Sequence, residues 1–536
     1  MNNTMKARLA ALSAALMASL LVVGTSCSDD GGEGRSGGYS WDIPGNKVVS
    51  IKPERHKLLR NPLQGWNIYA GLGDGMIGDF WQQYDRFEAA EGPVRVADFG
   101  TTLYIRGAWS DFNPAEGVYV WQDGVDTKPA KRFRMLVEGA RERNLKLAFT
   151  FVVDSRDKHY DFTPAYVRQA GAAGYTTTTG SVQVWSPYPD DPVFQQKYGR
   201  FLKDFAAKFN DPDVTAYVSG FGLGKWGETH SLVYSTGDEK PKEAVFTWIT
   251  DLMAGLFTRV PLFINYHRCL LSTKEFSGAS TAEAEDLIQR AVDKGFSLRH
   301  DAFGMKSYYT TWERGIAGRY FGIRPIIEEG GWVETSHGGS IAGDGYANYS
   351  EVRRGEFDEG RAAHVNMMDL RYSSNLKTGE THSWFNSAFG LVNDFIAEGG
   401  YRLYPDRVSV PVSASTGSTV RVTHRWSNLA WGYCPNNIPQ WNYKYKVAFA
   451  LLDKSTGKPV FTSVDTAPKI SDWLRGRHST YTADIRLAGV APGRYEWAIG
   501  IVDTSKGSGA IGLQVSVRDE FLTADGWVRL SDVNIN

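Results

Sequence analysis

Residues 193–221 read VFQQKYGRFLKDFAAKFNDPDVTAYVSGF, and this stretch decides the fold. From Phe194 to Phe209, apolar side chains recur at i, i+3 and i+4, which predicts a helix with one buried face. Asn210-Asp211-Pro212 ends that helix. The apolar run 214–221 then predicts a strand buried on both faces. A helix that leads directly into a buried strand is typical of α/β proteins with a parallel sheet.

The same alternation extends outward over residues 65–400. The predicted strands cover residues 65–70, 101–106, 146–153, 214–221, 262–266, 298–303, 324–328 and 364–367. The predicted helices cover residues 132–144, 193–209, 243–257, 281–294, 311–319, 352–363 and 384–396. About eight strands, each followed by a helix or a long loop, predict a (β/α)8 TIM barrel. The alternative is an open doubly wound sheet, but no early G-x-G-x-x-G phosphate turn favours it.

The pattern of apolar and polar residues changes near residue 404. Alternating, strand-like runs such as 419–424, 443–452 and 493–503 follow one another with turn residues between them. Short strands separated by turns predict a C-terminal antiparallel β-sandwich. We therefore expect a barrel domain at 46–403 and a sandwich domain at 404–536. Five aromatic residues near one loop are candidates for a carbohydrate-binding or partner-docking surface: Trp426, Trp431, Tyr433, Trp441 and Tyr443.

The first residues have the pattern of a secretory signal. Two basic residues precede an apolar run at 9–23, which is too short to cross a membrane, and Gly24-Thr25-Ser26-Cys27 follows. This tetrapeptide resembles the lipobox of bacterial lipoproteins, which implies a signal peptide at 1–26 and lipid attachment at Cys27. Residues 27–45 predict a flexible tether. The acidic segment 28–34 resembles the signal that sends many Bacteroidetes lipoproteins to the outer face of the outer membrane, so we expect a surface-exposed protein.

Composition narrows the expected partners. The chain has 59 basic and 60 acidic residues, without a long run of either sign, which argues against nucleic acid. Its 17 Trp, 26 Tyr and 27 Phe suit a carbohydrate substrate, although many of them must be core. Beyond Cys27 only Cys269 and Cys434 remain, too few for a disulfide framework or a thiolate metal site. The histidines lack close ligand spacing such as H-E-x-x-H, so we expect no metal and no cofactor. The lipid anchor is the one expected contact with a membrane.

Acidic residues follow two of the predicted barrel strands. In a TIM barrel the active site lies at the C-terminal ends of the strands. The fourth strand runs towards Glu228, and the seventh ends in Glu328-Glu329. Two carboxyl groups at facing strand ends are what glycoside hydrolysis requires. A single glutamate at a strand end is more often a solvated residue or a salt-bridge partner, but the paired spacing favours catalysis.

A family resemblance supports this interpretation. Residues 106–121, RGAWSDFNPAEGVYVW, resemble the segment after the second strand of family 42 β-galactosidases and related clan A glycosidases. Residues 185–194, WSPYPDDPVF, are similar to the same enzymes. The whole chain looks closer still to Bacteroidetes lipoproteins that pair a glycosidase-like barrel with a C-terminal sandwich.

The resemblance implies roles for the two acids. Glu228 would be the acid/base and Glu328 the nucleophile, preferred over Glu329 because clan nucleophiles usually stand two residues before a glycine, here Gly330. The sequence departs from the clan at Gly227, where these enzymes normally have an asparagine that binds the sugar. We also expect burial near Trp226 to raise the pKa of Glu228.

Further strand-end residues are candidates for substrate binding: Arg106, Trp109, Asp154, Trp185, Trp226, His230, Asn265, Tyr266, Tyr308 and Trp332. His267, Lys306 and Asn366 are weaker candidates of the same kind. The sequence thus predicts an exported glycoside hydrolase, most simply a retaining one, that acts on a poly- or oligosaccharide. The alternative is a non-catalytic glycan-binding lipoprotein that keeps the barrel as a scaffold.

Overall fold

A computed structural model describes residues 40–73, 79–274, 278–301, 303–306, 308–328, 345–371, 380–507 and 509–536. Within these, Trp41–Asn536 belongs to one unit of the chain. The predictions made for Cys27, Glu329 and Trp332 fall outside the described residues.

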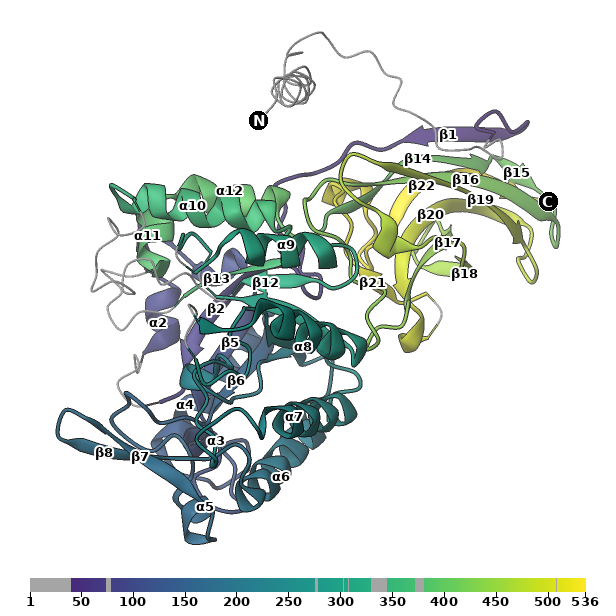
Figure 1. Ribbon diagram of the computed structural model, residues 1–536. Helices are drawn as coiled ribbons and strands as arrows, with labels where there is room; N and C mark the ends of the chain where they lie inside the picture. Colours follow the sequence, from purple (N-terminus) through teal and green to yellow (C-terminus); the bar gives the residue numbers. More distant parts are fainter. Residues whose placement is uncertain are drawn as a thin grey trace, which may run out of the picture. The chain divides into compact units, whose positions relative to one another are not determined.

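Eight parallel strands form a closed ring, which confirms the predicted (β/α)8 barrel (Figure 1). In chain order they are β2 (Gly65–Gly71), β5 (Gly100–Ala108), β6 (Lys146–Val152), β9 (Thr215–Ser219), β10 (Leu262–Asn265), β11 (Phe296–His300), β12 (Ile326–Glu328) and β13 (Met367–Leu370). The ring closes where β13 pairs in parallel with β2.

Helices connect the strands. The main ones are α4 (Lys128–Glu142), α6 (Pro192–Phe209), α7 (Lys242–Leu256), α8 (Thr281–Asp293), α9 (Thr311–Tyr320), α10 (Tyr349–Ala362), α11 (Glu380–Ser387) and α12 (Phe389–Glu398). Helix α6 begins where the sequence predicts, because the Asp191 side chain accepts from the Phe194 N–H and Pro192 occupies the first turn. The single helix predicted at 384–396 is two helices that break at Ala388. Short helices α2 (Phe80–Tyr84), α3 (Trp109–Phe112) and α5 (Ala165–Gln169) complete this layer.

Alternation along the strands separates two sets of side chains. Tyr104, Phe263 and Ile327 belong to the core that fills the barrel interior and continues into the sandwich. Neighbours of opposite parity, such as Ile264 and Ile326, belong to the core between the barrel and its helices. The parity of a strand residue therefore tells whether its side chain faces the barrel interior or the helices.

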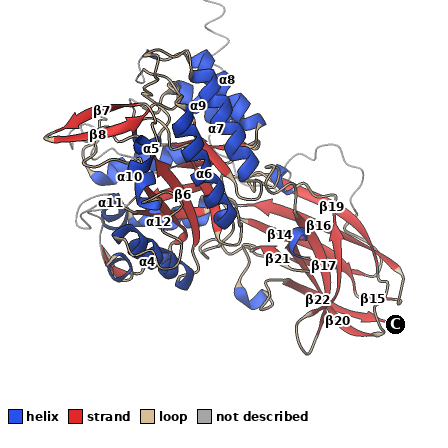
Figure 2. Cartoon of the chain, turned by 90° about the horizontal axis from the view of Figure 1, so that it is seen from below, coloured by secondary structure: helices blue, strands red, loops and turns tan. Residues whose placement is uncertain are grey.

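Two β-hairpins, which the sequence analysis did not predict, are inserted between strands of the barrel. One joins β3 (Phe87–Ala89) to β4 (Gly92–Val94), and the other joins β7 (Gly174–Thr179) to β8 (Val182–Pro187). The second hairpin stands out from the barrel (Figure 2). Of the helices in the described ranges, none has the length and apolar character needed to cross a bilayer.

The C-terminal domain consists of two mainly antiparallel sheets. One has the order β1 (Asn46–Ser50), β14 (Leu403–Pro411), β16 (Thr419–Asn428) and β19 (His478–Arg486). The other has the order β15 (Ser413–Ala414), β22 (Val528–Ile535), β20 (Gly493–Asp503), β17 (Tyr445–Asp453) and β18 (Pro459–Asp465), with β21 (Ile511–Leu513) beside β20. These sheets agree with the predicted sandwich. The boundary differs at one place, because β1, expected in the barrel domain, pairs with β14 and completes a sandwich sheet.

The aromatic residues expected to form a binding surface on the sandwich are mostly core. Trp426, Trp431, Tyr433 and Trp441 are buried, and only Tyr443 of the five is exposed. Trp426 stacks on Trp473 with 5.0 Å between ring centroids. Burial removes these rings from the outer surface, so they stabilise the sandwich and its contact with the barrel instead of forming an exposed glycan-binding surface.

Candidate active site

The loop that follows β9 has an unusual backbone. Trp226, Thr229 and Ser231 all adopt left-handed conformations, with φ of 59°, 62° and 50°. This region disfavours non-glycine residues and most strongly a β-branched one such as Thr229. Each such residue costs on the order of 1–3 kcal/mol and persists only where the surroundings enforce it, which is common at functional sites. The strained residues lie on both sides of Glu228, the acid predicted at this strand end.

Gly227 precedes Glu228 and adopts a conformation that favours glycine. Its φ is +77°, and a Cβ atom there would lie 3.0 Å from the carbonyl oxygen of Phe151 on the neighbouring strand β6. Only glycine fits this conformation and this spacing without strain. The loop is therefore built differently from one that carries an asparagine before the glutamate.

We expect Gly227→Asn to destabilise the protein instead of supplying the missing sugar contact. The backbone strain and the contact with β6 predict a loss of about 1–3 kcal/mol in the free energy of unfolding. Urea denaturation measures it, with Gly237→Asn as a control, since Gly237 also has a positive φ but no atom within 4 Å of a Cβ. Equal stability losses in the two variants would contradict the packing argument.

Glu228 lies in the mouth of the barrel, where its carboxylate contacts Arg106 and His230. Arg106, from the end of β5, donates from Nη2 to Glu228 Oε1 at 3.1 Å and also to the carbonyl oxygen of Trp226. His230 Nε2 lies 3.5 Å from Glu228 Oε2. Only 12% of the Glu228 side chain is exposed. The structure thus brings together three of the predicted site residues.

The electrostatics of Glu228 differ from the sequence-based expectation. Burial by itself raises its pKa, but the hydrogen bond from His230 and the positive charges of Arg106 and Arg299 outweigh that effect. The net result is a pKa well below the ordinary value of a glutamate. The expectation of a raised pKa is wrong because it counted burial near Trp226 and left out the partners from other strands.

Two further side chains hold the backbone of Glu228. His267 Nε2 lies 2.8 Å from the Glu228 carbonyl oxygen and donates to it. Asn265 Nδ2 reaches the same oxygen at 3.5 Å. Burial and the nearby His230 lower the pKa of His267 to about 3, so it is neutral at physiological pH. A neutral imidazole with its proton on Nε2 is the form that this contact requires.

A second carboxylate enters the mouth from β11, and the sequence analysis did not single it out. Asp301 accepts from Arg299 Nε at 3.0 Å and from Asn265 Nδ2 at 3.2 Å. Arg299 is fully buried and also donates to Ser219 Oγ at 2.8 Å. Asp301 lies inside the predicted strand 298–303, whereas the observed β11 ends at His300, so the strand-end criterion did not select it.

Trp226 forms part of the rim of the site. Its indole Nε1 donates to Asp157 Oδ2 at 2.9 Å, and Lys225 Nζ lies 4.3 Å from its ring centroid. The ring is half-buried, so a sugar that stacks on it has to share it with the ammonium group of Lys225.

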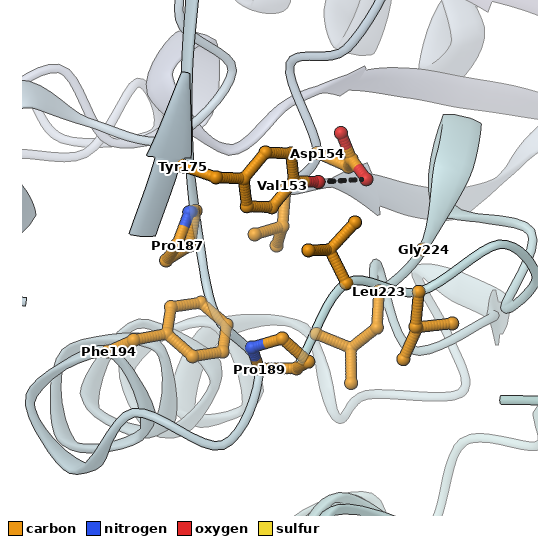
Figure 3. A pocket seen from close by; sticks show the side chains of 10 residues that line it. Val153, Asp154, Tyr175, Pro187, Pro189, Phe194, Leu223 and Gly224 are labelled. Carbon is orange, nitrogen blue, oxygen red and sulfur yellow. Dashed lines mark hydrogen bonds between the residues drawn. The ribbon is translucent and has the colours of Figure 1, made fainter. Parts of the chain in front are cut away.

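Asp154 and Trp185 form contacts with residues of the β7–β8 hairpin. Asp154 accepts from Arg156, from Ser186 Oγ at 3.2 Å and from the Tyr175 hydroxyl at 3.0 Å (Figure 3). Beside it is a hollow of about 20 Å³, which is room for roughly one water. Trp185 is buried, and the backbone of Gly174 lies against its ring. Both predicted sugar contacts are thus engaged within the protein.

Several other predicted contacts lie away from the mouth. Trp109 is fully buried among aromatic rings, including Tyr198 at 5.0 Å. Tyr266 is fully buried and faces Tyr309 on the helix side of the barrel. Asn366 lies at the opposite end of the barrel, where Nδ2 donates to the carbonyl oxygens of Leu63 and Tyr433. Tyr308 is half-buried and packs beside Met305, and Lys306 is exposed.

Glu328 is not brought together with Glu228. It shares the parity of Ile326, whose side chain packs against the helices, and both are opposite in parity to the interior residue Ile327. Its carboxyl is fully buried, and neither oxygen meets a hydrogen-bond donor among the described residues. Burial and the neighbouring charge of Glu356 on α10 raise its pKa well above the ordinary value. Burial and the charge of Glu356 therefore favour the protonated form of Glu328, whose proton can bind Glu356.

Around Glu328 lies a group that we call the buried acid cluster: Glu328, Glu356 and Glu380, with Arg353 and Arg371. Arg353 is fully buried and forms an ion pair with Glu356. Arg371 Nε lies 4.0 Å from Glu380 Oε2. Burial raises the pKa of Glu380 to about 7 in spite of both arginines. The cluster has more carboxyl groups than cations, which favours retention of a proton.

The raised pKa of Glu380 predicts how stability changes with pH. A folded-state pKa of about 7 against an ordinary 4.5 means that the folded protein binds this proton more tightly. The resulting stabilisation is fully present below about pH 4.5 and is lost as pH rises to about 7, with an upper limit of about 3 kcal/mol. We expect Glu380→Gln to flatten this slope in urea denaturation between pH 5 and 8. The exposed Glu138→Gln should keep the wild-type slope, and an unchanged slope in Glu380→Gln would refute the assignment.

Comparisons with known proteins give the following similarities. No protein-family model and no curated protein matches the sequence. An exo-β-1,4-mannosidase from Opitutaceae bacterium strain TAV5 aligns at 14% identity over 65% of this chain, with a TM-score of 0.35. That alignment covers 58% of the mannosidase, less than two thirds of its length.

Two other solved structures align over more of their length. An endo-glycoceramidase II from Rhodococcus sp. matches at 14% identity over 81% of this chain and 98% of its own, with a TM-score of 0.34. A GH30 endoxylanase from Clostridium papyrosolvens C71 matches at 12% identity over 82% and 97%, also with a TM-score of 0.34. Identities and TM-scores this low carry no argument about activity.

Proposed function

We propose that this protein is a glycoside hydrolase that acts on a poly- or oligosaccharide at the mouth of the barrel. One observation carries the proposal: Glu228 lies in the loop after the fourth strand, almost enclosed, between Arg106 and His230, and three residues of that loop have strained backbones. A carboxyl group, a guanidinium and an imidazole at this position supply the acid–base and charge-stabilising groups that cleavage of a glycosidic bond needs. The resemblance of residues 106–121 to family 42 β-galactosidases supports the same class.

Glu228 is the proposed acid/base. Because it is ionised in the free protein, the proton for the leaving oxygen has to be acquired when substrate binds. His230, at 3.5 Å, is the nearest group that can hold that proton. A substrate that displaces Arg106 from Oε1 would also raise the pKa of Glu228 and favour its protonation.

A retaining mechanism requires a second carboxylate as nucleophile, and the seventh strand supplies two candidates. Glu328 faces the helices and its pKa is raised, which does not suit a nucleophile. Glu329, the alternative left open by the sequence, lies outside the described residues. Turnover of Glu328→Gln and Glu329→Gln on one substrate distinguishes them, because loss of the nucleophile abolishes the covalent step, whereas Glu328→Gln acts through packing.

The experiment that tests the proposed function is a hydrolysis screen of the purified full chain against a panel of plant, microbial and host glycans. Release of reducing ends from at least one glycan supports it, and NMR of the first-formed anomer shows whether configuration is retained. Glycan binding without release of sugar would overturn it.

That outcome would favour the second candidate function, a non-catalytic glycan-binding protein. The ion pair between Arg106 and Glu228 favours this alternative, since it keeps the carboxyl ionised. Gly227 in place of the usual asparagine favours it as well.

We also propose that the protein is exported as a lipoprotein with its lipid on Cys27, and that it faces the cell exterior. The support is the sequence of residues 1–34, including its resemblance to the lipobox and to the acidic export segment of Bacteroidetes lipoproteins. Metabolic labelling with a fatty-acid probe tests it, since Cys27→Ser should abolish the label.

A further inference from the structure

A cavity of about 130 Å³ lies at the end of the barrel opposite to Glu228. Its barrel wall includes Lys146, which begins β6, and Thr215, which begins β9. Its other wall comes from the sandwich and includes Trp441 and Tyr445. The cavity thus lies between the two domains and has no part in the candidate active site.

Four cations line this cavity, and two carboxylates balance only half of their charge. Lys444 Nζ lies 3.1 Å from Asp503 Oδ2, and Lys506 forms an ion pair with Asp213. The two remaining cations, Arg60 and Lys146, form no ion pair with any carboxylate among the described residues.

Arg60 and Lys146 donate to backbone oxygens instead. Arg60 donates to the carbonyl oxygens of Gly100 at 2.8 Å and Ala97 at 3.0 Å. Lys146 donates to the carbonyl oxygen of Pro212. These contacts fix the positions of both side chains without neutralising them.

Holding these charges together is unfavourable. Burial lowers the pKa of Arg60, although the charge of Asp98 opposes this shift, and burial with repulsion from Lys506 and Lys444 lowers the pKa of Lys146, although Asp213 opposes it. A partly buried cation that no carboxylate contacts directly costs free energy. Ionisable groups with shifted pKa values are common at functional sites, and an anionic ligand would complete this arrangement. The alternative is that water alone solvates both groups.

We propose that this cavity binds the oxyanion group of a small ligand, a carboxylate, sulfate or phosphate, between Arg60 and Lys146. The flat side chains of Trp441 and Tyr445 give the same cavity an apolar wall, which fits a sugar ring that carries the acidic group. The ligand is therefore either an acidic saccharide or a free inorganic anion, and both share the chemistry that the two cations recognise.

The test is binding to the full chain at constant ionic strength. The probes are sodium sulfate, sodium phosphate and D-glucuronate, with glucose as the neutral control, measured by calorimetry and by thermal shift. At least one anion should bind saturably, and glucose should not. Lys146→Met should weaken that binding at least about 10-fold, because a charge-assisted contact is lost. Lys203→Met, an exposed lysine of α6, should bind as the wild type does.

If Lys146→Met does not fold, Lys146→Gln takes its place, since it retains a donor for the Pro212 carbonyl without the charge. Saturable binding of glucuronate alone would identify an acidic saccharide, and binding of sulfate or phosphate would identify an inorganic anion. Absence of saturable binding by all three probes, or equal affinity in Lys146→Met and the wild type, would overturn the proposal. No readout depends on hydrolysis, so a failure of the proposed function leaves this test intact.

Discussion

Replacement of Glu228 by glutamine is expected to lower turnover by roughly 10²–10⁴-fold while the protein stays folded and keeps its affinity for the glycan. Loss of a general acid or base has an effect of this size. Glutamine keeps the shape of the side chain and can still accept from Arg106, but it cannot act as the proposed acid/base. The measurement is kcat and KM on the glycan that the hydrolysis screen identifies.

The matched control is Glu243→Gln, which removes an exposed carboxylate of α7 and should leave kcat unchanged. Circular dichroism of both variants shows whether the fold is intact. A Glu228→Gln enzyme with wild-type kcat would remove Glu228 from the mechanism. Asp301, the other described carboxylate of the mouth, would then be the next residue to replace.

Local pattern was enough to predict the barrel. The spacing of phenylalanines and the Asp-Pro start predict a helix such as α6. A continuous apolar run predicts a buried strand such as β6. Those signals depend on neighbours in the chain. The pairing of β1 with β14 depends on a partner more than three hundred residues away, and no local pattern shows it.

The candidate site was predictable to the extent that strand ends determine it. Glu228, Arg106, His230 and Asn265 meet because each lies near the C-terminal end of a strand of the same ring or in the loop after it. Trp109 and Tyr266 also follow strands, yet they turn into the helix layer, since the first residues of a loop can face either side. The pKa of Glu228 was predicted in the wrong direction because His230 in the same loop, together with Arg106 and Arg299 from other strands, outweighs the effect of burial.

Strand seven was hardest to predict. β12 has only three residues, so the sequence offers too little alternation to tell which of two adjacent glutamates faces the barrel interior. A glycine two residues later favoured Glu328 by analogy. The structure shows which way Glu328 faces, because Glu328 lies on the same side of the strand as Ile326 and near Arg353 and Glu356 of α10. These are properties of packing.

The position of Arg353 predicts the largest change in stability. We expect Arg353→Met to lower the free energy of unfolding by about 3–5 kcal/mol at neutral pH, because it leaves Glu356 buried without its cation. The same change removes the donor to Ser383 Oγ, at 2.7 Å, and the guanidinium that lies 5.3 Å from the centroid of the Trp384 ring. Urea denaturation followed by tryptophan fluorescence measures the loss. Arg354→Met is the matched control. Arg354 is the next residue of the same helix but is about half exposed, so its replacement should cost little stability.

Two further measurements separate a charge effect from a simple loss of packing. First, Glu356→Gln added to Arg353→Met should recover part of the stability, because it removes the carboxylate that lost its partner. Second, the loss in Arg353→Met should be smaller at pH 5 than at pH 8. The carboxyls of Glu328 and Glu380 bind protons more tightly in the folded state, so at pH 5 the cluster carries less negative charge for Arg353 to balance. A loss that is the same at both pH values, without recovery in the double variant, would mean that Arg353 stabilises the barrel through packing alone. It would also mean that the buried acid cluster does not need a cation to hold α10 against strand seven.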